Sequence, residues 1–441
     1  MPRRTGFRFS IRGDPRSGNA PRPTPHAPRP TPHAPRPPGS PLPAPDPTPR
    51  FPRGAGPGDK SPVPFFWAAA GFALLAAVIQ LWQFVAARRF PLHRRVPNPD
   101  FHPAVSILKP LKGADPHSRA GLASWLAQSY PGRIQFLFGI HDASDPAGDV
   151  VRALLAEYPD RDARLVVCPD RPGTNAKVGT LAQLEPLARH DLLLVSDADV
   201  HVDPGLLDQL VLPMRDPGVG LANCFYRMAN TSTAALRWEA IAVNADFWSQ
   251  VLQSRMLKPQ DFALGAVMLA RRADIAAIGG FAGLADHLAD DYQLGHRIHR
   301  LGRRIELSTV AVDCWDPPLG WGAVWAHQLR WTRTIRVCQP GPFAASVLAN
   351  GSVWTFAWLA AALATGHAPW PACGLLALRA VLAADLYRTM RRGLPGHAMP
   401  WMVWLRDLLG FVLWAAAFLG NTVVWRGTRF RVLRDGRLVA L

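Results

Sequence analysis

The chain has 441 residues, a formal net charge of +17 and 49% hydrophobic residues. This length allows one large domain or two, with enough apolar sequence left over for membrane segments. The basic charge comes with no nucleic-acid-binding signature, and the five cysteines form no CxxC pair, so we expect neither a nucleic-acid partner nor a zinc site or disulfide framework.

The first 61 residues are rich in Pro, Arg and Gly. They repeat the sequence PRPTPHA at Pro21–Ala27 and Pro28–Ala34. Such a composition buries too little apolar surface to fold, so residues 1–61 are predicted to form a disordered tail. A Pro-rich docking site, or upstream sequence wrongly included in the reading frame, are the alternatives. The segment lacks the apolar core of a signal peptide.

An uncharged apolar stretch, Pro64–Ala87, comes after the tail. About 20 apolar residues span a bilayer, so residues 62–88 are predicted to form a transmembrane helix. Arg88, Arg89, Arg94 and Arg95 come next, and they favour a cytoplasmic location for the domain on their C-terminal side. The flanking basic charge also suggests anionic lipids as partners.

Residues 89–336 alternate short apolar runs with helical stretches. The predicted strands are Val105–Leu108, Ile134–Ile140, Arg164–Val167, Leu192–Ser196, Val219–Asn223 and Ala263–Leu269. The predicted helices include Ala147–Glu157, Leu206–Leu212 and Ala234–Ser254. This alternation indicates an α/β domain with a mostly parallel sheet, helices on both faces, and ligands at the carboxyl ends of the strands.

Residues 337–426 are predicted to hold two to three membrane helices within Gly341–Gly366, Trp370–Tyr387 and Met399–Trp425. The second and third stretches contain charged residues, which weakens them as spans. Three spans would also place the basic tail, residues 427–441, outside, against the positive-inside rule, unless one segment lies in the membrane interface.

The acidic pair in DLLLVSDADV gives the strongest chemical signal. Asp197 and Asp199 follow the buried strand Leu192–Ser196, and residues two apart in an extended chain point the same way. A divalent cation that holds a diphosphate explains two such carboxylates, since Mg²⁺ takes one or two carboxylates plus phosphate oxygens. A solvated turn with acidic caps is the alternative.

Four further motifs lie on the same domain. Their residues are Lys109, Lys112 and Asp115 in SILKPLKGADP, Asp142 and Asp145 in FLFGIHDASDPA, Asn175 and Lys177 in PGTNAKVGTL, and Asp290 and Asp291 in LADDYQLGHRIHRLG. Asp115 or Asp142 can accept hydrogen bonds from a nucleoside, and Lys177 can meet phosphate or sugar. Asp291 can deprotonate an alcohol.

Simpler interpretations accompany these assignments. Lys109 and Lys112 are typical of solvated loop charges, and Asp145 before a proline indicates a helix cap. His296 and His299 indicate a solvated helix face. The pair Arg330–Trp331 stands just before the membrane segments, where Arg can bind a diphosphate and Trp can stack on a sugar.

The order KPLKGAD, HDASDPA, GTNAKVGTL, SDAD, ADDYQLG and HQLRW resembles the ceramide glucosyltransferase family (glycosyltransferase family 21), especially its bacterial branch associated with hopanoid biosynthesis. The resemblance covers roughly residues 64–430. It implies a GT-A nucleotide-sugar fold, a UDP-sugar donor, a divalent cation (Mg²⁺ or Mn²⁺) and inversion at the anomeric carbon.

By resemblance, Asp115, Asp197 and Asp291 match the family's essential aspartates, the last as catalytic base, and Arg330 and Trp331 match the end of its (Q/R)xxRW motif. Where the family has Gln or Arg, this chain has His327, with Gln328 beside it.

We therefore expect a multi-pass, inner-membrane glycosyltransferase that moves glucose or N-acetylglucosamine from UDP to a hydroxyl of a lipid, of hopanoid or ceramide type. A processive polysaccharide synthase is the alternative enzyme, and a membrane scaffold without activity the alternative outside enzymes. The nucleotide-sugar site is predicted to comprise Asp115, Asp142, Lys177, Asp197, Arg330 and Trp331, with Asp197 and Asp199 on the metal and Asp291 as base.

Overall fold

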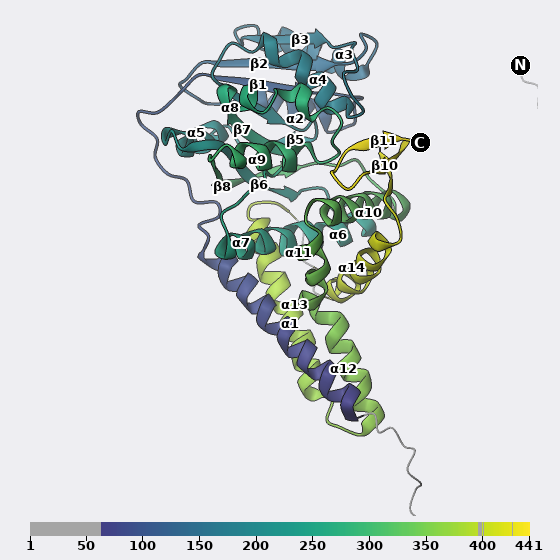
Figure 1. Ribbon diagram of the computed structural model, residues 1–441. Helices are drawn as coiled ribbons and strands as arrows, with labels where there is room; N and C mark the ends of the chain where they lie inside the picture. The colour runs from purple at the N-terminus through teal and green to yellow at the C-terminus, as the bar shows by residue number, and fades with distance from the viewer. Residues whose placement is uncertain (1–62, 396–398, 400, 426) are drawn as a thin grey trace, which may run out of the picture. The chain divides into compact units, whose positions relative to one another are not determined.

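The computed structural model describes residues 63–395, 399, 401–425 and 427–441 (Figure 1). The predicted tail, residues 1–61, lies outside the described residues. The described residues belong to the compact unit that ends at Leu441.

An eight-stranded sheet in the order β3-β2-β1-β4-β7-β6-β8-β5 forms the centre of the α/β domain. Its strands are β1 Val105–Pro110, β2 Ile134–Ile140, β3 Ala163–Val167, β4 Leu192–Ser196, β5 Val200–His201, β6 Val219–Met228, β7 Val267–Arg271 and β8 Arg304–Cys314. Pairs β1–β2, β1–β4, β2–β3 and β6–β8 are parallel, whereas β7 is antiparallel to β4 and β6, and β5 to β8. The sheet is therefore mixed, with β5 and β7 reversed, and the expectation of a mostly parallel sheet is confirmed for the other strands.

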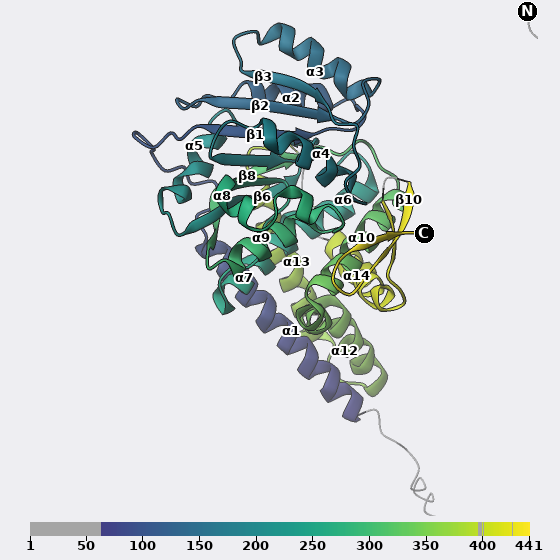
Figure 2. The same ribbon diagram turned by 45° about the horizontal axis from the view of Figure 1, so that its top comes forward.

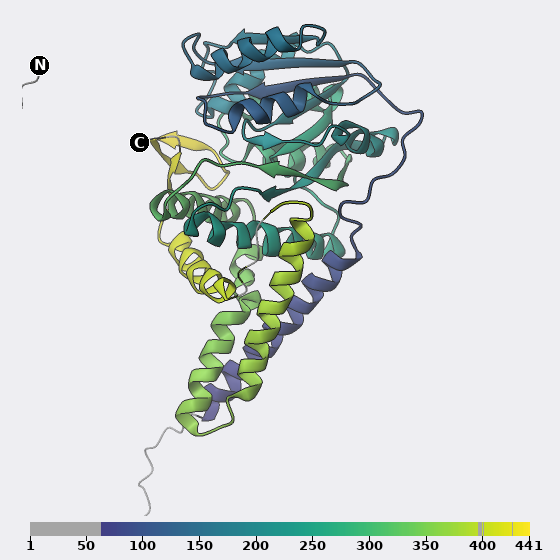
Figure 3. The same ribbon diagram turned by 180° about the vertical axis from the view of Figure 1, so that it is seen from behind.

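Helices cover both faces of the sheet, seen from opposite sides in Figures 1 and 3. The helices of this domain are α2 Ser118–Leu126, α3 Pro146–Glu157, α4 Ala176–Leu184, α5 Leu206–Val211, α6 Ala234–Ile241, α7 Trp248–Leu257, α8 Arg272–Ala277 and α9 Asp290–Arg300. Short helical turns add η1 Glu185–Leu187, η2 Leu212–Arg215 and η4 Phe281–Leu284. The predicted helix Ala234–Ser254 is continuous but contains a π-helical segment, η3 Ala242–Phe247.

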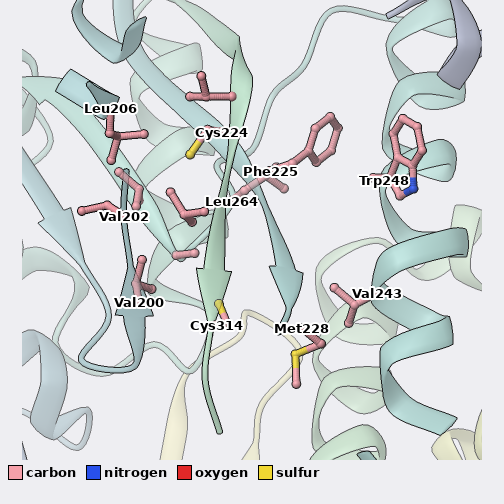
Figure 4. Packing of buried hydrophobic residues seen from close by; sticks show 14 of the residues in the cluster. Val200, Val202, Leu206, Cys224, Phe225, Met228, Val243, Trp248, Leu264 and Cys314 are labelled. Carbon is pink, nitrogen blue, oxygen red and sulfur yellow. The ribbon is translucent and has the colours of Figure 1, made fainter. Parts of the chain in front are cut away.

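Alternate residues of the central strands pack into two separate hydrophobic cores. Leu192 and Leu194 of β4 belong to the core that includes α2, α3, α5, α6 and α7. Leu193 and Val195 belong to the core that includes α4, α8 and α9. This period of two is the geometry of an extended strand covered on both faces. Figure 4 shows part of the first core, where Phe225 of β6 packs toward Trp248 of α7.

Four of the six predicted strands, β1, β3, β6 and β7, have observed bounds that differ from the prediction, and two further strands of this sheet were not predicted. β7 begins at Val267 rather than Ala263, because Leu264 donates its backbone N–H to the Asn223 side chain and remains in a loop. β5 and β8 were missed. Charged and polar residues interrupt the apolar pattern of β8, whose buried positions nevertheless alternate.

A group of helices extends away from the sheet. It comprises α1 Val63–Arg89, α12 Gly351–Thr365 and α13 Trp370–Met390, with α11 Pro340–Ala345 and η5 Ser346–Ala349 before α12 (Figures 1 and 3). By length and composition, Pro64–Arg89 and Trp370–Met390 can cross a membrane. The bent pair Pro340–Ala349 and Gly351–Thr365 can form a third span, with a bend of 43°. Each of these stretches covers a segment predicted to be a membrane helix.

The remaining helices, α10 Trp321–Cys338 and α14 Met402–Phe418, lie between these helices and the sheet (Figure 2). The stretch Met399–Trp425, predicted as a possible span, contains the 17-residue α14 and the strand β9, and it is not among the candidate spans of the described residues. The predicted basic tail, residues 427–441, also differs from expectation. It contains two strands, β10 Thr428–Val432 and β11 Leu438–Ala440, which form a three-stranded sheet with β9 Thr422–Trp425. Phe430, Val432 and Leu438 bury their side chains in the core of this sheet.

Candidate functional site

The acidic pair lies where the sheet changes strand direction. Asp197 and Asp199 follow β4, whose neighbour β7 is antiparallel. The Asp197 N–H donates to the Ala266 carbonyl at 3.2 Å, and the Trp315 N–H donates to the Asp199 carbonyl at 3.1 Å. Backbone hydrogen bonds to two other segments thus hold the main chain at both acidic residues.

Lys177 joins two of the predicted motifs. Its Nζ lies 2.7 Å from Asp197 Oδ1 and 2.9 Å from Asp290 Oδ2, and only 12% of its side chain is exposed. The two carboxylates raise the pKa of Lys177 against the opposing effect of burial, so the ammonium stays charged. The first turn of α4, the residue after β4 and the start of α9 therefore meet at one cation.

Asp291 lies next to this ion-pair cluster. Burial, reinforced by the neighbouring Asp290 charge, raises the pKa of Asp291 to about 6. Its Oδ1 accepts a hydrogen bond from the Tyr292 N–H at 2.7 Å. The backbone of Gly265 approaches closely, since a Cβ there would lie 2.8 Å from Asp291 Oδ2. A carboxyl group with such a pKa is suited to accept a proton near neutral pH.

Lys109 contradicts the expectation of a solvated loop charge. Its side chain is fully buried at the end of β1, with Nζ 2.7 Å from the Asp197 carbonyl and 3.2 Å from Ser196 Oγ. The ammonium also lies 4.7 Å from the centre of the Trp125 ring. Burial lowers the pKa of Lys109 to about 7, opposed by Asp199 and Asp197. The acidic pair thus has an internal cation beneath it.

A cavity of about 350 Å³ opens beside Lys177. That volume lies within the range of small-molecule sites. Its polar lining residues include Lys112, His141, Asp142, Arg171, Lys177 and Thr180. Asp142 is exposed in this cavity and accepts hydrogen bonds from the Ser144 N–H and hydroxyl, both at 2.8 Å. The sequence had left Asp115 as the alternative to Asp142 for binding the nucleoside.

Three other motif residues shape the surrounding loops. The Asp115 Oδ1 accepts from the N–H groups of His117 and Ser118, and Asp115 does not line the cavity. Asp145 caps α3 through the Ala147 N–H, which confirms the predicted cap, and also accepts from the Gly113 N–H. Asn175 caps α4.

Helix α10 carries the predicted pair Arg330–Trp331 toward the site. The Trp331 ring lies 4.5 Å from the His327 ring and 6.5 Å from the Tyr226 ring, centre to centre. His327 Nδ1 and Gln328 Nε2 each lie 2.8 Å from Oε1 of Glu239, a fully buried carboxylate on α6. The residues that stand at and beside the departure from the family motif therefore both contact one buried carboxylate.

The acidic pair fits a divalent cation in the way that Mg²⁺ is bound with phosphate. Burial, reinforced by the Asp197 charge, raises the pKa of Asp199 to about 7, which indicates that a nearby positive charge would be favourable. Among the described residues, no group of three or more His, Cys, Asp or Glu side chains can hold a metal ion. Asp197 and Asp199 would thus hold the cation together with oxygens of the bound diphosphate.

Several residues at this site were missed in the sequence. His141, Arg171 and Glu239 had no assigned role, although His141 adjoins Asp142 and Arg171 precedes the Gly-bearing loop, and Lys109 was interpreted as a solvated loop charge. Glu239 gave no local signal, because its partners stand 88 and 89 residues away in the chain.

Comparison with known proteins agrees with this geometry. The sequence model described as Glycosyl transferase family 21 matches residues 66–438. The chain is 23% identical to ceramide glucosyltransferase 1 of Caenorhabditis elegans over 390 residues, which are 83% of this chain and 82% of that one. It is 30% identical to a ceramide glucosyltransferase of Komagataella phaffii over 168 residues, which are 35% of this chain and only 33% of that one.

A bacterial relative and a solved structure extend the comparison. An N-acetylglucosaminyltransferase of Rhizobium leguminosarum bv. viciae is 24% identical over 60% of this chain and 63% of its own length. The mannosyltransferase PcManGT from Pyrobaculum calidifontis, solved with GDP-Man and Mn²⁺, has a TM-score of 0.50 at 21% identity and covers 81% of this chain and 99% of that one. The structural likeness supports a common glycosyltransferase fold of the GT-A type.

Proposed function

Since the chain belongs to glycosyltransferase family 21, we propose that it transfers glucose or N-acetylglucosamine from a UDP-sugar to a hydroxyl of a membrane lipid, with inversion at the anomeric carbon. The relatives' names include both ceramide glucosyltransferases and an N-acetylglucosaminyltransferase, which supports these two sugars as candidates. The acceptor is proposed to be a hopanoid or ceramide-type lipid.

The ion-pair cluster at Lys177 carries this proposal. A single buried ammonium binds Asp197 of the acidic pair and Asp290, the neighbour of Asp291. A donor held at the acidic pair would therefore lie close to a carboxyl group whose pKa is about 6. Under this proposal, donor binding and proton removal, the two requirements of direct glycosyl transfer, would be joined within one cluster.

The donor is proposed to lie along the carboxyl edge of the sheet. Its nucleoside would occupy the cavity of about 350 Å³, where Asp142 and His141 can hydrogen-bond with a base or ribose. Arg171 and Lys177 line the same cavity and can neutralise diphosphate oxygens. Asp197 and Asp199 would hold the divalent cation, which stabilises negative charge on the leaving diphosphate. Asp115, which lies outside this cavity, is proposed to contact the UDP-sugar from the loop between β1 and α2.

Asp291 is proposed to remove the proton from the acceptor hydroxyl. The oxygen would then attack the anomeric carbon as the bond to the diphosphate breaks, and the proton would remain on the Asp291 carboxyl group. Trp331 and Tyr226 provide aromatic surface near this position, and Arg330 lies on the same helix as Trp331. This surface can bind the sugar or the polar head of the lipid.

The enzyme is proposed to be a multi-pass membrane protein with its sugar-transfer domain in the cytoplasm. Basic residues Arg88 and Arg89 end α1 on the side of this domain. At the end of α13, the Arg391 guanidinium donates to the Met228 carbonyl at 2.6 Å, so the chain returns to the domain before α14 begins. After α14, Leu438 donates to Asp286 of the same domain. Helix α14 is therefore proposed to lie in the membrane interface, with the C-terminus on the cytoplasmic side.

The test uses membranes that contain the full chain, incubated with labelled UDP-glucose or UDP-N-acetylglucosamine, Mg²⁺ or Mn²⁺, and a lipid mixture with hopanoids or ceramide. Asp291→Asn is compared with wild type. Asp149→Asn, an exposed acid on α3, is the matched control. We expect label in a discrete lipid of the organic phase for wild type and for the control, and none for Asp291→Asn.

The two other outcomes would each reject part of the proposal. Label found only in a solvent-insoluble polymer would indicate a polysaccharide synthase. Full activity of Asp291→Asn would remove Asp291 as the base while leaving the glycosyltransferase assignment in place.

A further inference from the structure

The C-terminal sheet β9–β11 contacts the segment that leads into the proposed base. We call Ala285–Ala289, which joins η4 to α9, the base segment. The Leu438 N–H donates to the Asp286 carbonyl at 2.7 Å, and the Leu288 N–H donates to the Gly436 carbonyl at 3.2 Å. His287 and Arg437 form an antiparallel bridge between these bonds. The residues around Arg437 thus pair with the base segment through a short antiparallel bridge.

Apolar packing reinforces this pairing. Leu288 is buried in a small hydrophobic cluster with Val423, Phe430, Val432 and Leu438 of the C-terminal sheet. Val337 of α10 packs against the same cluster. Arg333 and Arg336 of α10 donate to the Thr422 carbonyl and to Asn421 Oδ1. The sheet therefore lies between the base segment and the helix that carries Arg330 and Trp331 (Figures 1 and 2).

The loop before α4 holds the other side of the base segment. The Asn175 N–H donates to the Ala285 carbonyl at 2.7 Å, and its side-chain amide donates to the His287 carbonyl at 2.8 Å. The Asp286 carboxylate accepts from the Thr174 N–H at 3.0 Å. Both flanks of the segment are thus hydrogen-bonded, and Lys177, two residues beyond Asn175, then binds Asp290 directly.

We infer that the C-terminal sheet is a positioning element of the catalytic centre, which holds the base segment so that Asp291 meets the acceptor hydroxyl. This inference rests on the proposed role of Asp291 as base. Helix α9 begins at Asp290 with no side-chain cap on Ala289, so the position of its first turn depends on the contacts of the base segment. A displacement of about 1 Å at a reacting group can cost on the order of 100-fold in rate.

The test compares two proline substitutions at the ends of β11. Leu438→Pro removes the N–H that bonds the base segment. Leu441→Pro is the matched control, because the Leu441 N–H donates to the Arg429 carbonyl within the C-terminal sheet, at 3.0 Å. A chain that ends at Val432 lacks β11 altogether and serves as the third variant. The two proline variants, as full-length chains, and the truncated chain are purified in detergent, and UDP binding is measured by calorimetry.

We expect kcat to fall on the order of 100-fold for the truncated chain and at least about tenfold for Leu438→Pro, with KM for the UDP-sugar within about twofold of wild type. Leu441→Pro should stay within about threefold. A synthetic peptide of residues 433–441 should restore part of the activity of the truncated chain, which a merely unfolded protein would not show.

Wild-type kcat in both Leu438→Pro and the truncated chain would overturn the inference, and so would equal loss of UDP binding and turnover without rescue by the peptide. Asp291→Asn is assayed in parallel. If Asp291→Asn is inactive while Leu438→Pro is fully active, only the positioning role fails. If Asp291→Asn is active, the base assignment itself fails.

Discussion

The acid limb of the pH–rate profile provides a sharp test of Asp291. Burial and the Asp290 charge raise the pKa of Asp291 to about 6, from an ordinary value of 3.8. The proposed base would work as a carboxylate, so activity should be present above this pKa and lost as the pH falls through it. With a pKa of about 6, roughly 91% of the groups are ionised at pH 7 and roughly 9% at pH 5.

We therefore expect kcat/KM to fall about tenfold between pH 7 and pH 5. A carboxyl group with its ordinary pKa would stay about 94% ionised at pH 5, and the rate would hardly change. The assay is transfer of label from UDP-sugar to lipid in detergent micelles, from pH 4.5 to 8, with UDP binding measured at each pH. A rate that is constant down to pH 5, with binding intact, would refute the assignment.

Asp290→Asn tests the cause of the shift. Loss of the neighbouring negative charge, together with release of Lys177 from Asp290, should lower the pKa of Asp291 and move the acid limb to lower pH. The midpoint is the quantity compared, because the substitution also weakens the ion-pair cluster and lowers the maximal rate. Asp149→Asn, exposed on α3, should leave the midpoint unchanged.

Lys109→Met should lower kcat/KM at least about tenfold, because hydrogen bonds from a charged donor contribute about 1.5–3 kcal/mol. Lys258→Met, at an exposed lysine, is the control and should stay near wild type. Equal activities of the two variants would refute a role for Lys109 in supporting the Asp197 backbone. Asp199→Ala should raise the cation concentration for half-maximal rate at least about tenfold, and an unchanged titration would remove Asp199 from the metal site. His327→Gln should keep most of the activity, since an amide can also donate a hydrogen bond to Glu239, whereas His327→Leu should lose it. Equal rates in the two variants would contradict a role for the hydrogen bond between His327 and Glu239.

The α/β domain could be predicted because its central strands are short apolar runs, a pattern that indicates buried strands. β2 and β4 have the predicted bounds, whereas β8 was missed because its sequence mixes charged and apolar residues. The strand order could not be predicted from the sequence, because β7 pairs with β4 and β5 pairs with β8, and these partners lie far apart along the chain.

For the site, the sequence identified the residues that project from strand ends but not those buried beneath them. Asp142, Lys177, Asp197 and Asp291 were named from their motifs, and Lys177 does join Asp197 to Asp290. Lys109 was misjudged, because a lysine between a strand and a loop is usually solvated. The strands near the C-terminus were missed because four arginines of residues 427–441 mask three buried apolar side chains.

Arg379 is a buried arginine within α13, one of the candidate membrane spans, and its ion pairs bear on the order in which the chain would assemble. The Arg379 guanidinium lies 2.8 Å from Asp407 of α14 and 2.9 Å from Asp246 in the π-helical segment η3. A lone arginine at the centre of a membrane helix opposes insertion by about 2.5–3.5 kcal/mol.

Asp246 is synthesised before Arg379, and Asp407 only after α13 is complete. A nascent chain that stops between the two helices therefore has one of the two carboxylates that neutralise this charge. In the proposed membrane arrangement, stable insertion of α13 would therefore depend on prior folding of the domain that contains Asp246 and on the later synthesis of α14, whose Asp407 completes the pairing of Arg379.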